Sequence, residues 1–212
     1  MERKSLKDRI KPIVYPIINF IPRRRLKNKN FTIICDNCWA GKVYQELGLP
    51  YQTPFVGMFV FSPDYIKMLK NIKHYLSGNI PLKFVKESKY IKDFDNAYPL
   101  AILDDIELHF LHYADEEEAT QKWNRRLKRM HWDNLYFKFN DNDASTYELM
   151  KEFEELPYKG KVIFSSKNYS DLPSLVHFKS AEKQGHVGID LKTYHRYFDA
   201  VTWLNKGGED LT

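Results

Sequence analysis

Short apolar runs rich in β-branched residues alternate along this sequence with longer segments in which apolar residues recur every three to four positions. The runs at 31–35, 134–139 and 161–166 are typical of buried strands. Helical spacing follows the first run and separates the others. A chain that alternates strands with helices of ten to seventeen residues builds a parallel sheet covered by helices. The sequence therefore predicts an α/β fold with a mainly parallel sheet flanked by helices.

One antiparallel hairpin is predicted at 98–113, YPLAILDDIELHFLHY. Two apolar runs flank Asp104 and Asp105 there, and the second run alternates apolar with polar side chains. Further strands are predicted at 54–61 and 81–85.

The helix at 115–131 has the clearest signals. Asp115 can cap its first turn, acidic residues follow directly, and basic residues crowd its end, which complements the helix dipole. Other helices are predicted at 40–47, 62–76, 145–156 and 194–204.

The formal charge of +5 over 212 residues is concentrated before the first strand. We expect residues 1–30 to form a basic N-terminal arm and residues 31–212 to form a single α/β domain. The remainder is close to neutral, which argues against binding of nucleic acid. No apolar run reaches the ~18 residues of a membrane span.

A cytoplasmic location is expected because the chain shows no secretory signal and has only two cysteines. The arm is either solvated or packed on the protein, or it contacts the inner face of the membrane peripherally through its basic and apolar residues.

Cys35 and Cys38 form the only Cys-x-x-Cys of the chain. A redox pair needs its first cysteine at a helix N-terminus, whereas Cys35 belongs to the strand. A zinc site would need a second pair of ligands that the chain lacks, so no metal is assigned to these residues. Cys38, at the turn from strand to helix, is the stronger chemical candidate.

The turn around Cys38 could stabilise an oxyanion. The backbone N–H groups of residues 39–41 would point at it, and Asn37 adds a side-chain amide. Ala40 and Gly41 are small enough to let a substrate approach the backbone. The alternative is that Cys38 is a small thiol packed in a tight turn.

Three stretches, at 31–69, 105–113 and 122–139, closely resemble an uncharacterised bacterial family known as exopolysaccharide or capsular-polysaccharide biosynthesis proteins. The resemblance implies an α/β domain that serves surface-polysaccharide assembly. In that family the Asn37-Cys38-Trp39 core recurs, whereas the position of Cys35 is often Ser. The same turn is similar to the start of capsule acetyltransferases with an esterase-like fold.

These likenesses imply an acyl transfer, most simply of an acetyl group, onto a sugar hydroxyl. Cys38 would be the nucleophile or an oxyanion-hole element, and Asn37 would be an oxyanion donor. His112, which closes the predicted strand, would be the base. Acetyl-coenzyme A would be the donor, and a sugar or lipid-linked oligosaccharide would be the acceptor.

Four further residues are candidates for binding the donor. Arg126 and Arg129 could hold its phosphates, although they could equally be a solvated helix end. Trp39 could stack on a ring or pack in the core, and Gly41 could admit the donor.

Two other functions remain open. Asp141 or Asp143 could hold the metal of a nucleotide-sugar-dependent glycosyltransferase or phosphotransferase. The chain could also be a non-catalytic partner in the assembly complex.

Overall fold

The computed structural model describes residues 20–188 and 190–208. Residues 1–19, most of the predicted basic arm, lie outside the described residues. The rest of the arm contains helix α2 (Phe20–Arg25).

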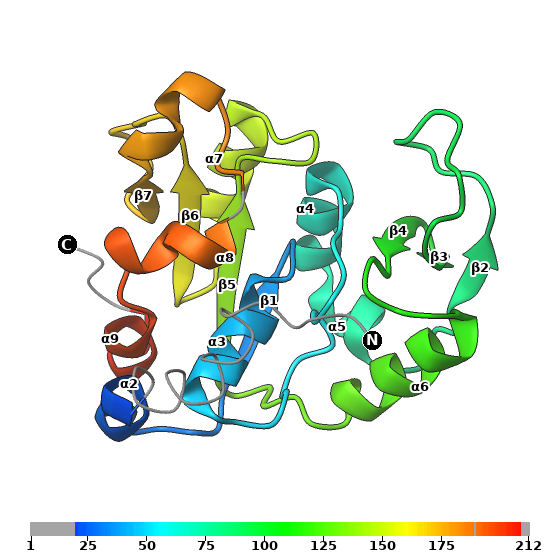
Figure 1. The fold of residues 1–212 in the computed structure, drawn as a ribbon, viewed down its shortest axis with the longest axis horizontal. Coiled ribbons are helices and arrows are strands. Elements are labelled where there is room, and N and C mark those ends of the chain that lie inside the picture. Colours follow the sequence, from blue (N-terminus) through cyan, green and yellow to red (C-terminus); the bar gives the residue numbers. More distant parts are fainter. Residues whose placement is uncertain (1–19, 189, 209–212) are drawn as a thin grey trace, which may run out of the picture.

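A four-stranded parallel sheet forms the centre of the fold (Figure 1). Its order is β1-β5-β6-β7, and every neighbouring pair is parallel. The strands are β1 (Thr32–Cys35), β5 (Leu135–Asn140), β6 (Lys161–Ser165) and β7 (Leu175–His177). Consequently the carboxyl ends of all four strands lie along one edge of the sheet. The prediction of an α/β fold with a mainly parallel sheet is confirmed.

The predicted hairpin is also confirmed, but it belongs to a second sheet. This antiparallel sheet has the order β2-β3-β4, with β2 (Lys83–Val85), β3 (Leu100–Leu103) and β4 (Ile106–His109). Asp104 makes the turn with a left-handed backbone at φ 58°, a conformation that Asp tolerates better than most residues.

Helices cover both faces of the parallel sheet. The longer helices of the protein are α3 (Trp39–Leu47), α4 (Ser62–Lys70), α6 (Glu116–Leu127) and α7 (Tyr147–Glu155). Of these, α6 lies by the antiparallel sheet, where its Trp123 packs on Phe110 after β4. The shorter ones are α5 (Ile72–Leu76), α8 (Asp190–Thr193) and α9 (Ala200–Asn205), together with the 3-10 helices η1 (Lys179–Gln184) and η2 (Tyr194–Arg196). Figure 1 shows α3, α8 and α9 on the near side of the parallel sheet.

Aromatic side chains fill the core on each face. On the face of α3 the fully buried Trp39 packs against Phe164, Tyr194 and Trp203. On the opposite face Phe139 stacks between Tyr65 of α4 and Phe153 of α7. Successive residues of a strand point to opposite faces, so Lys138, next to Phe139, is directed toward α3 and α8.

Three sequence predictions differ from the structure. The helix predicted at 62–76 is divided into α4 and α5, because Asn71 between them has a non-helical backbone at φ −140° and ψ 51°. Residues 54–61 form an extended connection with a single bridge from Phe59 to His109 rather than a strand. The predicted helix at 194–204 is interrupted, because the Asp199 side chain accepts from the backbone N–H groups of Val201 and Thr202 and starts α9 anew.

Among the described residues, no helix is both long and apolar enough to cross a bilayer.

Candidate functional site

Polar side chains gather where the parallel strands end. Residues 36–38 follow β1, residues 141–143 follow β5, and Asp190 reaches the same edge from α8. In α/β sheets this edge is the usual place for ligands.

Lys138 is the charged centre of this edge and is fully buried. Its Nζ lies 2.8 Å from Asp190 Oδ2 and 3.2 Å from Asp36 Oδ1. Burial alone would lower the pKa of Lys138, but the carboxylates of Asp190 and Asp36 hold it above its ordinary value, so the ammonium stays charged. Burial raises the pKa of Asp36 to about 6, against the opposing effect of Lys138.

Asn37 connects this charged group to helix α3. Its Oδ1 accepts from the N–H of Trp39 at 3.0 Å, and its Nδ2 donates to Asp190 Oδ2 at 3.0 Å. Asp190 Oδ2 also accepts from Asn140 Nδ2 at 3.3 Å. One side chain thus fixes both the start of α3 and the start of α8.

Cys38 lies beside this group as a half-buried thiol. Its Sγ lies 3.5 Å from the carbonyl oxygen of Met58. Burial and the nearby charge of Asp190 raise the pKa of Cys38 to about 11, so it is a neutral thiol at neutral pH.

Two of the three amides predicted to form an oxyanion hole have partners within the chain. The Trp39 N–H donates to Asn37, and the Ala40 N–H donates to the sulfur of Cys35. The Cys35 thiol in turn donates to the carbonyl of Asn37 at 2.8 Å, and burial raises its pKa well above the ordinary range. Cys35 is therefore a buried structural thiol.

His112 lies near Cys38 without bonding to it. It is exposed, follows the end of β4, and its N–H donates to the Gly57 carbonyl at 2.9 Å. The backbone of Gly57 also hydrogen-bonds to Cys38. The residues described include no hydrogen bond from the imidazole of His112 to the thiol.

The predicted donor-binding residues do not come together. Arg126 is buried, donates to the Val56 carbonyl and the Tyr113 hydroxyl, and lies over the ring of Tyr51. Arg129 is exposed and lines a shallow pocket with His131, whose N–H donates to the Thr32 hydroxyl at the start of β1.

Trp39 and Gly41 are both buried. The ring of Trp39 is enclosed by the aromatic core. A Cβ at Gly41 would lie 3.0 Å from Val56 Cγ1, so this glycine allows the chain itself to pack closely.

Comparison with known proteins places the chain in a family. The model of a family described as a domain of unknown function, DUF1919, matches residues 9–205. The chain belongs to the DUF1919 family. It is also 37% identical over 195 residues to an uncharacterised protein of Haemophilus influenzae. The aligned region covers 89% of this chain and 90% of that protein.

In this member of the DUF1919 family, Asp143 differs from the other acidic residues of the carboxyl edge, because Asp36, Asp141 and Asp190 all accept hydrogen bonds. It is half-buried on a left-handed backbone at φ 52°, followed by Ala144 at φ 64°. Burial raises its pKa, and the charge of Asp190 adds to this effect while Lys138 and His186 oppose it. Within the described residues, no group donates a hydrogen bond to its carboxylate. Backbone strain and a perturbed carboxyl together mark candidate functional residues.

Asp141 has a different role. Its carboxylate accepts from the N–H and hydroxyl groups of Ser166, from the Ser165 hydroxyl and from the N–H of Val187. These bonds connect the loop after β5 with the end of β6 and with the segment before α8. In the part of the chain that the structure describes, no three His, Cys, Asp or Glu side chains are grouped so that they could hold a metal ion.

A row of aromatic rings lies near Asp143. We define the aromatic wall as Phe59, Phe61, Tyr90, Phe94 and Tyr98, all half-buried. The rings contact one another in series, including a stacked pair of Phe61 and Tyr90 at 4.3 Å between centroids. The pKa of Tyr98 is raised by burial and by nearby acids that include Asp143, which places this carboxylate within electrostatic range of the wall.

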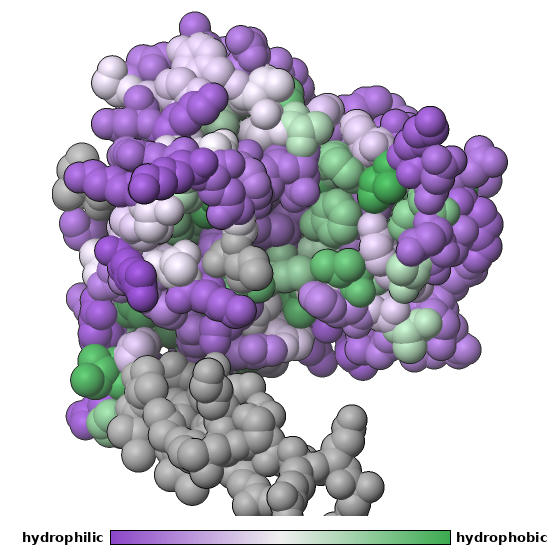
Figure 2. Space-filling model, turned by 45° about the horizontal axis from the view of Figure 1, so that its top comes forward, coloured by the Kyte–Doolittle hydropathy of each residue, from purple (hydrophilic) through white to green (hydrophobic). Residues whose placement is uncertain are grey.

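Figure 2 shows the surface from the side of the carboxyl edge. The surface is hollowed between the part that contains the parallel sheet and the part that contains the antiparallel sheet, and apolar side chains gather along the hollow.

Sequence reasoning missed two of these residues. Lys138 could have been suspected, because it is a lysine inside an otherwise apolar strand, LYFKF. No pattern in the sequence around Asp190 indicates its role, because its contacts with Asn37 and Lys138 form only when the chain returns to the end of β1.

Proposed function

We propose that this protein is a transferase of surface-polysaccharide biosynthesis that moves an acyl group, most simply acetyl, onto a sugar hydroxyl. The observation that carries the proposal is the Asp143 carboxylate, which follows β5 at the carboxyl edge, has no hydrogen-bond donor among the described residues and has a raised pKa. A general base needs an accessible carboxylate whose pKa is shifted toward neutrality.

Asp143 would take the proton of the acceptor hydroxyl as its oxygen attacks the acyl carbonyl. The new ester bond forms, the bond from the acyl carbon to the thiol sulfur of the donor breaks, and the proton on Asp143 returns to the released thiolate. Acetyl-coenzyme A supplies such a thioester. This direct transfer requires no thiolate on the protein, in keeping with a pKa of about 11 at Cys38.

Asn37 would stabilise the oxyanion. Its amide nitrogen carries two hydrogens, and one of them is donated to Asp190. The second could be donated to the developing negative charge. Cys38 would then line the site as a weak S–H donor.

The aromatic wall supports a sugar as the acceptor. Half-buried rings offer flat apolar faces, while carboxylates and amides at the carboxyl edge can bond to hydroxyl groups. The likeness of the three motif stretches to polysaccharide biosynthesis proteins supports the pathway. The proposal includes a cytoplasmic site of action, at or near the inner face of the membrane.

A nucleotide-sugar-dependent glycosyltransferase is the second candidate, because the same base and the same wall would activate an acceptor hydroxyl for glycosyl transfer. Ligand binding distinguishes the acyltransferase from the glycosyltransferase. Coenzyme A and acetyl-coenzyme A should raise the melting temperature if the protein transfers acyl groups, and UDP-glucose or another nucleotide sugar should do so in the alternative. A non-catalytic partner should respond to neither.

The decisive variant is Asp143→Asn, assayed with acetyl-coenzyme A and a panel of sugar acceptors. Loss of a general base should lower the rate by about 100-fold or more. Asp104→Asn is the matched control, because it changes an Asp with a similar left-handed backbone, at φ 58°, in the β3–β4 turn. Equal activity of Asp143→Asn and Asp104→Asn would exclude Asp143 as the base.

His112→Ala and Cys38→Ala complete the test. Retention of most activity in Cys38→Ala is expected for direct transfer, whereas its complete loss would favour the covalent route with His112 as the base.

A further inference from the structure

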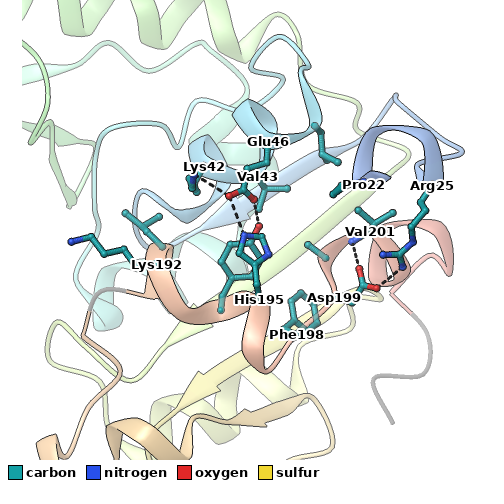
Figure 3. A pocket seen from close by; sticks show the side chains of 14 residues that line it. Pro22, Arg25, Lys42, Val43, Glu46, Lys192, His195, Phe198, Asp199 and Val201 are labelled. Atoms are coloured by element: carbon teal, nitrogen blue, oxygen red, sulfur yellow. Dashed lines mark hydrogen bonds and ion pairs between the residues drawn. The ribbon is translucent and has the colours of Figure 1, made fainter. Parts of the chain in front are cut away.

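A second pocket, of about 680 Å³, lies between α3 and the segment that runs from α8 to α9 (Figure 3). Its walls come from α2, α3, the segment from α8 to η2, and α9. This volume is within the range of small-molecule sites in proteins.

The two ends of the pocket differ in chemistry. Lys42, Lys192 and His195 lie toward one end, while Val43, Phe198 and Val201 lie between them and the other end, where Pro22 and Arg25 of α2 are found. A ligand that suits both parts has a charged head and an apolar body.

A buried carboxylate organises the charged end. Glu46 accepts from the Tyr194 hydroxyl, from Lys42 Nζ at 3.0 Å and from His195 Nε2 at 3.0 Å. Burial would raise the pKa of Glu46, but these donors more than offset that effect and lower it. Its negative charge is thereby balanced locally, and the exposed Lys192 adds a cation for which no described residue provides an acidic partner.

The charged end is close to the candidate site. Cys38, Lys42 and Glu46 are spaced four residues apart, so they lie on one face of α3. Lys42 is therefore about 6 Å along the helix axis from Cys38. Asp190, which bonds to Asn37 in the site, starts the segment that carries Lys192 and His195.

The end at α2, where Arg25 pairs with Asp199, lies beside an exposed apolar surface. Phe20 and Ile21 of α2 are 55% and 64% exposed, and they precede Pro22 and three consecutive arginines. Large apolar side chains beside basic residues are typical of a segment that touches an anionic membrane.

We propose that this pocket binds a single-chain lipid that carries a phosphate. The hydrocarbon chain of the lipid lies between Val43 of α3 and Val201 of α9. Its phosphate contacts Lys42, Lys192 and His195. Such a ligand would present whatever is linked to its phosphate near Cys38. The binding of the lipid itself does not depend on the transfer proposed for Asp143.

The test measures binding by calorimetry on the full-length protein with three probes: farnesyl phosphate, farnesol and inorganic phosphate. Farnesyl phosphate should bind, farnesol should bind at least tenfold more weakly, and inorganic phosphate should give no measurable heat. Equal binding of farnesyl phosphate and inorganic phosphate would show an anion site without a lipid chain, and would overturn the proposal.

Two exposed cations provide a matched pair of variants. Lys192→Glu should weaken farnesyl phosphate binding at least tenfold, because Lys192 lines the pocket. Arg196→Glu makes the same change of charge four residues later, outside the lining, and should bind as the native protein does. Equal weakening in both variants, or no binding to the native protein, contradicts the proposal.

Asp143→Asn distinguishes this proposal from the proposed function. It should bind farnesyl phosphate with unchanged affinity even where transfer is lost. If the protein binds the lipid but shows no transferase activity, the lipid-binding proposal is supported and the proposed transfer is refuted.

Discussion

The ammonium group of Lys138, in the middle of the sheet, lies 2.8 Å from the carboxylate of Asp190, at the start of a helix that returns over it. Both side chains are almost completely removed from water. An ion pair of this kind is costly to form, and it is more costly to break by removing only one partner.

We predict that Lys138→Met lowers the free energy of unfolding by about 3–5 kcal/mol, because the buried carboxylates of Asp36 and Asp190 lose their cation. Urea denaturation measures the change. Lys70→Met is the control, since it breaks the exposed pair with Glu152 and should cost less than about 1 kcal/mol. Similar losses in both variants would contradict the buried pairing.

The two thiols should differ in reactivity toward iodoacetamide. With a pKa of about 11, Cys38 holds only ~0.1% thiolate at pH 8, so it should label slowly and about tenfold faster per pH unit up to pH 10. Cys35 is fully buried and should label only on unfolding. Mass spectrometry of Cys35→Ala and Cys38→Ala assigns each site. Rapid labelling of Cys38 at pH 7 would revive its role as a nucleophile.

Ala144→Gly should stabilise the protein by about 0.5 kcal/mol. Glycine adopts the left-handed backbone at φ 64° without strain, and this gain exceeds the added entropy of the unfolded chain. Thermal unfolding measures the shift. Ala119→Gly, inside α6, serves as the opposite control and should cost about 1 kcal/mol or more. A loss in Ala144→Gly as large as that of the control would argue against a strained turn after β5.

Glu46 should make stability depend on pH. Burial raises its pKa, but the hydrogen bonds from His195, Tyr194 and Lys42 outweigh burial, so its folded pKa lies below its unfolded value. The ionised group therefore stabilises the fold above the unfolded pKa, and this contribution disappears as the pH falls through the folded pKa.

In Glu46→Gln we expect a loss of about 1–3 kcal/mol at pH 7, because hydrogen bonds to a charged acceptor are removed. The variant should then lose less stability than the native protein between pH 5 and pH 3. Urea denaturation at several pH values measures both effects, and parallel curves for the two proteins would contradict the lowered pKa.

Local patterns in the sequence predicted most of the fold. The strands at β1, β5 and β6 are short apolar runs, and α6 has its cap at Asp115, where the carboxylate accepts from the Glu118 N–H. These features depend on neighbouring residues, which a single sequence displays. The apolar run at 54–61 was misread as a strand, because burial of an extended connection selects the same residues as a strand does.

The site was less predictable because tertiary contacts determine it. The sequence pointed to the turn at Asn37 and Cys38, and the structure places that turn at the carboxyl edge beside Lys138 and Asp190. Helical spacing alone pointed to Arg126 of α6 and to Arg129, which the structure places beyond the end of that helix. That spacing could not reveal that Arg126 is bonded inside the protein.

The contact between Asn37 and Asp190 has a consequence for the order in which the protein is made. A ribosome releases Asn37 early and Asp190 close to the end of the described chain. Until then Asp36 is the one carboxylate of the described pair that Lys138 can contact, and the part of the pocket that α8 and η2 contribute is missing. Domains fold as their segments emerge, so the sheet can form before the site does. The candidate site can therefore be completed only after the segment that carries Asp190 has been made.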